Sequence, residues 1–166
     1  MGNSWQQLGA DLDGEAAGDR SGISVSLSKD GTRLAIGASG NDGNGSDAGH
    51  TRVYDWNGTA WRQVGSDIDG EAGGDESGRS VSLYSDGNWL AIGASNNGGT
   101  GLRAGHVRVY RWTGTNWQKL GADIDGEAAG DQAGISVSLS DNGRRVALGA
   151  YLNDGSGFES GHVRVY

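Results

Sequence analysis

The chain repeats itself at a constant interval, and this period restricts the folds that it can adopt. Tryptophan recurs at Trp5, Trp61 and Trp117, which are equally spaced, and Tyr54 and Tyr110 recur at the same interval. The 166 residues come within two of three whole periods. A unit of this size buries too little hydrophobic surface to fold alone, so its core has to come from packing on neighbouring units.

The middle unit contains four stretches with strand character. Residues 80–84 alternate polar and hydrophobic side chains, residues 89–94 are apolar on both faces, and residues 105–112 alternate again. A shorter fourth strand is expected over residues 116–121. The small Gly93 and Ala94, which end the second stretch, indicate that another backbone approaches closely there.

Four consecutive strands, with a long loop over residues 96–104 between the second and third and tight turns at the other links, predict one four-stranded antiparallel meander per unit. No segment shows helical periodicity beyond about one turn, so the expected fold class is all-β. Repeated meanders are typical of the blades of a β-propeller, in which radial stacking covers the faces of the sheets. A flat or solenoidal β-array is the alternative, but solenoid coils are usually shorter than this unit.

We therefore expect a single repeat array over residues 1–166. Its predicted parts follow the period. Residues 1–21 contain a strand equivalent to the fourth strand of a unit, followed by an inter-blade loop, and residues 22–66 form the first blade. Residues 67–122 form a loop and the second blade, and residues 123–166 form a loop and the third blade. The third blade lacks its fourth strand. The close match between units indicates a fragment of a longer array or an engineered chain, and recent duplication in a natural array would give the same pattern.

The order of motifs in each unit resembles the FG-GAP repeat, in the tryptophan-containing branch found in bacterial and algal surface or secreted proteins. The motifs that carry the resemblance are Gly18-Asp19, Gly22, Gly37-Ala38 and Val53-Tyr54, with their counterparts in the other units. The phenylalanine and proline of the family pattern are replaced, by Ser21, Ser77 and Ala133 and by Ser39, Ser95 and Tyr151. The resemblance implies an integrin-like propeller architecture and an extracellular or cell-surface location, whereas function does not follow from fold.

Composition excludes several classes of function. A net charge of −8 at pH 7 and a pI near 4.7 argue against nucleic-acid partners and anionic membranes. The chain has no cysteine, which rules out disulfides and thiolate chemistry and leaves the compartment open. No apolar run is long enough to insert into a membrane, and Met1-Gly2-Asn3 does not begin a signal peptide.

The strongest polar signal is an acidic motif that occurs once per unit, before the first strand. Carboxylates at alternate positions before a glycine could supply the oxygen ligands that Ca²⁺ requires. The other interpretation is that they accept backbone N–H bonds and order the crossing between blades. We commit to no metal site, and the weak candidates are Asp11, Asp13, Glu15, Asp19, Asp67, Asp69, Glu71, Asp75, Asp123, Asp125, Glu127 and Asp131.

Other polar positions repeat without forming a recognisable site. His50, His106 and His162 share one repeat position, so we expect half-buried histidines far apart around a ring. The acids of the loop between the second and third strands change between units and predict variable exposed loops, where ligand specificity would lie. The repeated tryptophans could stack on glycans but are expected to fill the layers between blades.

The two ends of the chain complement one another. The third unit stops after its third strand, and the segment around Trp5, Gln6, Gln7 and Leu8 has the sequence of the missing fourth strand. A three-bladed ring cannot close, but two chains could exchange these strands and form a six-bladed propeller with twofold symmetry. The predicted assembly interface joins Trp5, Gln6, Gln7 and Leu8 of one copy to Val163, Arg164, Val165 and Tyr166 of the other.

The sequence thus predicts a non-catalytic scaffold or binding module that assembles as a homodimer without a cofactor. No serine has a distinctive histidine or aspartate partner, and no residue supports a hydrolase. The alternative function is an extracellular propeller that binds glycans or mediates calcium-dependent adhesion.

Overall fold

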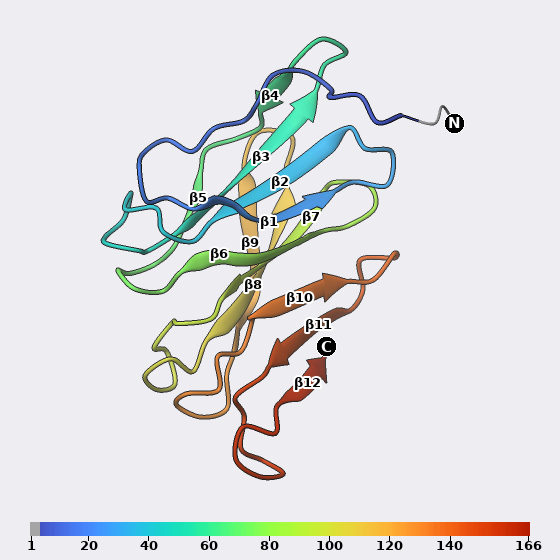
Figure 1. The fold of residues 1–166 in the computed structure, drawn as a ribbon. Helices are drawn as coiled ribbons and strands as arrows, with labels where there is room; N and C mark the ends of the chain where they lie inside the picture. The colour runs from blue at the N-terminus through green and yellow to red at the C-terminus, as the bar shows by residue number, and fades with distance from the viewer. Residues whose placement is uncertain (1–3) are drawn as a thin grey trace.

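Each repeat unit folds into its own antiparallel sheet, and the three sheets follow one another in chain order (Figure 1). The structure is a computed structural model that describes residues 4–166, and it contains only strands, turns and loops over that range. The all-β antiparallel prediction is confirmed. The prediction about Met1-Gly2-Asn3 falls outside the described residues. None of the described residues forms a helix long and apolar enough to span a bilayer.

The strand order within each sheet is that of a simple meander. The first sheet contains β1 (Ser21–Leu27), β2 (Arg33–Ala38), β3 (His50–Trp56) and β4 (Trp61–Gln63), with the short β5 (Ile68–Asp69) added beside β3. The second contains β6 (Ser77–Leu83), β7 (Trp89–Ala94), β8 (His106–Trp112) and β9 (Trp117–Asp125). The third contains β10 (Ser136–Leu139), β11 (Val146–Ala150) and β12 (His162–Val165).

Two strands of the middle unit are longer than the sequence pattern indicated. Strand β6 begins at Ser77 rather than at residue 80, and the register shifts between Ser77 and Ser80. Gly78, which lies inside this bulge, has a φ of 83°, a conformation that glycine adopts without a steric penalty. Strand β9 continues to Asp125 and pairs a second time with β8, so the start of the acidic motif is part of the sheet.

The sheets pack face to face through their first two strands. Strand β6 lies against β1 and β2, and β10 lies against β6 and β7. The core between the first two sheets includes Val53, Val81 and Leu90, and the core between the last two includes Val107 and Leu148. Stacking of neighbouring units therefore supplies the hydrophobic core that one unit cannot make alone.

The close backbone approach that Gly93 indicated is present at both junctions. A Cβ atom on Gly93 would lie 2.0 Å from the carbonyl oxygen of Gly134 in the next unit, and one on Gly37 would lie 2.0 Å from that of Gly78. The same carbonyls accept hydrogen bonds from serine hydroxyls, because Ser24 Oγ donates to Gly78 and Ser80 Oγ donates to Gly134, each at 2.8 Å. The repeated serines thus join one sheet to the next.

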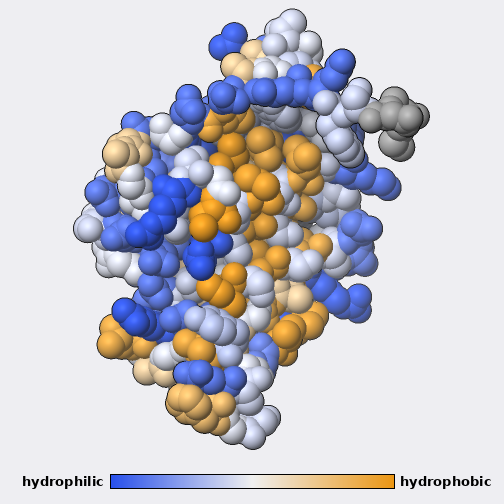
Figure 2. All heavy atoms as spheres, in the orientation of Figure 1, coloured by the Kyte–Doolittle hydropathy of each residue, from blue (hydrophilic) through white to orange (hydrophobic). Residues whose placement is uncertain are grey.

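The outer faces of the first and last sheets carry exposed hydrophobic side chains. Val25 in β1 is 62% exposed, whereas its counterpart Val81 in β6 is 8% exposed. At the other end, Val163 in β12 is 70% exposed, whereas its counterpart Val107 is fully buried. Figure 2 shows hydrophobic atoms gathered on the viewed face in the region of β1 and β2. The same surface is buried inside the array and uncovered at its ends.

Two positions per unit hold a residue other than glycine in the left-handed region of φ, where most side chains are disfavoured. They are Arg20, Glu76 and Gln132 at one repeat position, and Asp47, Arg103 and Glu159 at the other, with φ between 50° and 56°. The two positions meet at each junction, because the backbone N–H of Glu76 donates to Asp47 and that of Gln132 donates to Arg103. This geometry recurs although the side chains differ.

Candidate functional site

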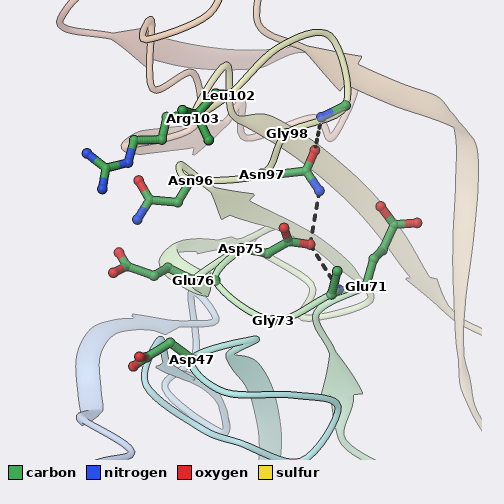
Figure 3. Close-up of a pocket in the computed structure, with 13 residues that line it drawn as sticks. Asp47, Glu71, Gly73, Asp75, Glu76, Asn96, Asn97, Gly98, Leu102 and Arg103 are labelled. Carbon is green, nitrogen blue, oxygen red and sulfur yellow. Dashed lines mark hydrogen bonds between the residues drawn. The ribbon is translucent and has the colours of Figure 1, made fainter.

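The last aspartate of each acidic motif organises a turn. The carboxylate of Asp75 is buried and accepts hydrogen bonds from the backbone N–H of Ala72 and from the side-chain amide of Asn97 (Figure 3). The equivalent carboxylates make the same contacts in the other units: Asp19 with Ala16 and Asn41, and Asp131 with Ala128 and Asn153. At these positions the acids accept N–H bonds and order the crossing between sheets, as one of the two interpretations predicted.

The buried position changes the acidity of Asp19. Burial alone would raise the pKa of this carboxyl, but hydrogen bonds from Ala16, Asn41 and Glu15 outweigh burial and bring the pKa below its ordinary value. A carboxylate surrounded by N–H donors is satisfied by the protein itself.

The remaining acids of the motif come together with the histidines. Glu15, His50 and Asp67 form one cluster, and Glu71, His106 and Asp123 form the equivalent cluster in the next unit. His50 and His106 are buried, and Nδ1 of each lies 3.8 Å from the aspartate of its cluster. The histidines were expected to be half-buried. His162 is half-buried as expected, whereas His50 and His106 are fully buried.

Each cluster also includes an arginine from the same strand as the histidine. Arg108 donates from Nε and Nη2 to the two carboxylate oxygens of Asp123, at 3.0 and 2.8 Å, and it also pairs with Glu71. Lys119 forms a further ion pair with Asp123. In the first unit, Arg52 instead donates to the backbone carbonyl of Asp13 and lies 3.6 Å from Glu15.

These contacts shift the pKa values of the cluster. Burial is the largest effect on His106 and lowers its pKa, and the positive charge of Arg108 lowers it further. Burial would raise the pKa of Asp123, but the hydrogen bonds from Arg108 and Lys119 outweigh burial and lower the pKa to about 2. The lowered pKa values favour a neutral imidazole at His106 and an ionised carboxylate at Asp123.

The donors of the clusters do not fit a calcium ion. Calcium takes six to eight oxygen ligands. Here an imidazole nitrogen faces the carboxylates, and Arg108 and Lys119 together already balance the charges of Glu71 and Asp123. The other acids of the motif lie outside these two clusters. The Asp11 carboxylate accepts a hydrogen bond from Gln7, and the backbone carbonyls of Asp13 and Asp125 accept hydrogen bonds from arginine side chains. Asp69 is exposed in β5, and Glu127 faces His162.

The low pKa of Asp123 predicts a pH dependence of stability. A carboxyl whose pKa is lower in the folded state than in the unfolded state stabilises the fold above its unfolded pKa, and this contribution is lost as the pH falls toward its folded pKa. The free energy of unfolding is therefore expected to fall between pH 4 and pH 2, and Asp123→Asn is expected to flatten this decrease. Chemical denaturation across this range measures it. A steeper decrease in the variant than in the parent chain would contradict the assignment.

A shallow groove of about 630 Å³ lies beside these turns. Loop residues of the first two units line it, among them Asp47, Glu71, Glu76, Asn96 and Arg103 (Figure 3). Its walls include the loop between the second and third strands, where ligand specificity was expected. The side chains at equivalent positions of this loop differ, because Asp47 and Glu159 correspond to Arg103.

The tryptophans pack in pairs at the edges of the sheets. The rings of Trp56 and Trp61 lie 5.5 Å apart between centroids, and those of Trp112 and Trp117 lie 5.4 Å apart. All four are partly buried. Trp5 differs, because it is fully exposed. The expectation that the rings fill space between units thus describes the two pairs but not Trp5.

The predicted interface residues lie at the two uncovered ends of the array. The segment from Trp5 to Leu8 forms no strand in the single chain, but the carbonyl of Leu8 accepts a hydrogen bond from Trp61 Nε1 at 3.0 Å. The carbonyl of Val64, its repeat counterpart, accepts the same bond from Trp117 Nε1 at 3.1 Å. The N-terminal segment therefore already lies beside the first sheet as a fourth strand lies beside the next sheet.

The fold and its junctions define a class: an all-β repeat protein built from stacked antiparallel sheets. Residues 10–54 match the family model described as FG-GAP repeat, which confirms the resemblance over the first unit. No curated protein matches the chain. Among solved structures, hydrazine synthase of Kuenenia stuttgartiensis is similar, with 11% sequence identity and a TM-score of 0.46. The match covers 76% of this chain and 29% of that chain.

Proposed function

We propose that the chain is a non-catalytic scaffold of the propeller type, in which each sheet is a blade and the loop groove is available for binding. The FG-GAP match and the meander order of the sheets support the blade assignment. The polar groups repeated in each unit serve internal contacts: the serines join sheets, and the acids hold turns and arginines. The FG-GAP match also supports a surface or secreted location, which is part of the proposal.

We further propose that two copies close a six-bladed ring. One observation carries this proposal: the surfaces exposed at the two ends are the surfaces that pack on each other at both internal junctions. Val25 of the first sheet corresponds to the buried Val81, and Val163 of the last sheet corresponds to the buried Val107. In two copies placed head to tail, the last sheet of each copy would pack on the first sheet of the other. The two junctions formed in this way would close the arrangement and bury all the exposed end surfaces.

The repeat specifies the register of the exchanged strand. In the second sheet Val109 pairs with Leu120, and Tyr110 pairs with Lys119. The corresponding pairs in the third sheet would be Val165 with Leu8 and Tyr166 with Gln7 of a second copy. Trp5 of that copy would donate its indole N–H to the carbonyl of Leu120, as Trp61 and Trp117 do to Leu8 and Val64.

The molar mass in solution tests the ring. Light scattering is expected to give twice the mass of the 17.1 kDa chain at micromolar concentration, and deletion of residues 1–9 is expected to give the monomer. A parent chain that remains monomeric would overturn the proposal.

Gly149→Ala supplies a point variant for the same experiment. Gly149 corresponds to Gly37 and Gly93, but within the chain its Cβ would meet only side chains, the nearest being Ser136 Oγ at 2.5 Å. A serine side chain can rotate, so the subunit should remain folded. In the ring the added methyl group would collide with the carbonyl of Gly22 of the second copy, so this variant is expected to be a folded monomer.

The alternative, a calcium-dependent adhesion or glycan-binding propeller, would use the loop groove. Two carboxylates and one guanidinium in its lining, from Asp47, Glu76 and Arg103, offer hydrogen bonds to a polar ligand. A glycan panel and calorimetric titration with calcium separate this function from that of a scaffold alone.

A further inference from the structure

The polar cluster of the third unit has fewer members than the other two. Its glutamate and histidine are in place, with His162 Nδ1 3.6 Å from Glu127, and Arg164 Nη1 lies 3.7 Å from the same carboxylate. In the first two units the first aspartate of the following acidic motif faces the histidine Nδ1 at 3.8 Å. No aspartate among the described residues takes this position at His162.

The guanidinium of Arg164 has an unpaired N–H group at the position where the second unit has its aspartate. Arg164 Nε is buried and has no hydrogen-bond partner, whereas Nε of its counterpart Arg108 donates to Asp123 at 3.0 Å. A buried N–H group of a guanidinium without an acceptor is costly, because it has lost its water and gained nothing in exchange. The Arg164 side chain is otherwise held, since Nη2 donates to the backbone carbonyl of Asp125.

The N-terminal segment carries the matching group. Asp11 is the repeat counterpart of Asp67 and Asp123, and it is exposed. Its carboxylate accepts a hydrogen bond of 2.8 Å from Gln7, four positions earlier, as Asp67 accepts one from Gln63 and Asp123 one from Lys119. The local arrangement that the cluster requires is therefore already formed on this segment, away from any histidine.

We propose that Asp11 of a second copy completes the third cluster, lying against His162 Nδ1 and accepting a hydrogen bond from Arg164 Nε. This inference rests on the proposed ring and names the polar contact that would hold it together. Each of the two junctions between copies would contain a charged pair made of residues from different copies. In the same register, Leu12 and Asp13 of the second copy would pair with Val163 and His162, as Ile124 and Asp125 pair with Val107 and His106. A charged pair formed between copies favours the head-to-tail orientation over other contacts between the exposed apolar faces.

A charge-exchange experiment tests the pair. Asp11→Lys and Arg164→Glu each place like charges at both junctions, whereas the double variant restores opposite charges at both. Sedimentation velocity at one fixed concentration is expected to show a dimer for the parent chain, monomers for the single variants and a dimer for the double variant. Asp11→Asn, a milder change at an exposed residue, is expected to weaken dimerisation by at least ~10-fold. Asp42→Asn, on an exposed loop, is the matched control and should leave the dimer unchanged.

The outcomes separate this pair from the ring itself. A dimeric parent chain with single variants that dimerise equally well, or with no recovery in the double variant, would overturn the assignment of Asp11 and leave the ring standing. A monomeric parent chain would overturn the ring and the pair together. Circular dichroism of each variant shows whether the subunit is folded, so that loss of the dimer is attributed to the junction and not to misfolding.

Discussion

Gly93→Ala is expected to disrupt the junction between the second and third sheets and to cost about 3 kcal/mol of stability, the upper end of the usual range for overpacking. The added Cβ would lie 2.0 Å from the carbonyl oxygen of Gly134, a backbone atom that cannot move aside without separating the two sheets. The same carbonyl accepts the hydrogen bond from Ser80 Oγ, so separation also breaks this link. Urea denaturation followed by circular dichroism measures the change.

The matched control for this variant is Gly149→Ala. Both glycines face a serine hydroxyl at 2.5 Å, but only Gly93 also faces the backbone of a following unit. In a dilute, monomeric sample, Gly149→Ala is therefore expected to cost much less than Gly93→Ala. Equal losses in the two variants would mean that the serine contact, and not the approach of the next sheet, requires the glycine.

Leu90→Ala is expected to have the second large effect, about 2–5 kcal/mol, which is the usual range for a fully buried leucine. Leu90 is fully buried in the core between the first two sheets, where its neighbours include Val81 and Leu83. Removing its side chain leaves a cavity that the strands on either side cannot fill. The midpoint of thermal or chemical unfolding gives the magnitude.

Leu34→Ala provides the comparison, because Leu34 has the same repeat position in the first sheet and is only partly buried. Its truncation is expected to cost less than that of Leu90. Similar costs at the two positions would show that stability comes from within each unit, and would contradict the role of stacking in forming the core.

Much of the fold could be predicted from the sequence, because the alternation of polar and hydrophobic residues that marks a strand is a local pattern. The alternation around Val81 and Val107 located two strands of the middle unit, and the small Gly93 predicted the close backbone approach. Strand β9 was predicted too short, since Asp123 to Asp125 has the composition of a loop. It is held in the sheet by pairing with β8, which no local pattern reveals.

The polar clusters could be predicted only in part, because their members come from distant parts of the chain. Glu71 belongs to the acidic motif that precedes the second sheet, His106 lies in the third strand of that sheet, and Asp123 begins the next acidic motif. They meet only after the acidic segment has crossed from one sheet to the next. The common period of all three residues, with an arginine two positions after each histidine, is the signal that could have grouped them.

The residues with positive φ at the junctions bring different charges together at each junction. The backbone is the same at every junction, but the first brings two acids together, Asp47 and Glu76, with Arg20 3.7 Å from one carboxylate and 3.8 Å from the other. The second brings Arg103 to Gln132. A closing junction would bring Glu159 to Arg20, an acid to a base. The array therefore combines a uniform backbone geometry with a different set of charges at each junction, so that in the proposed ring the closing junction would differ in charge from the two internal ones.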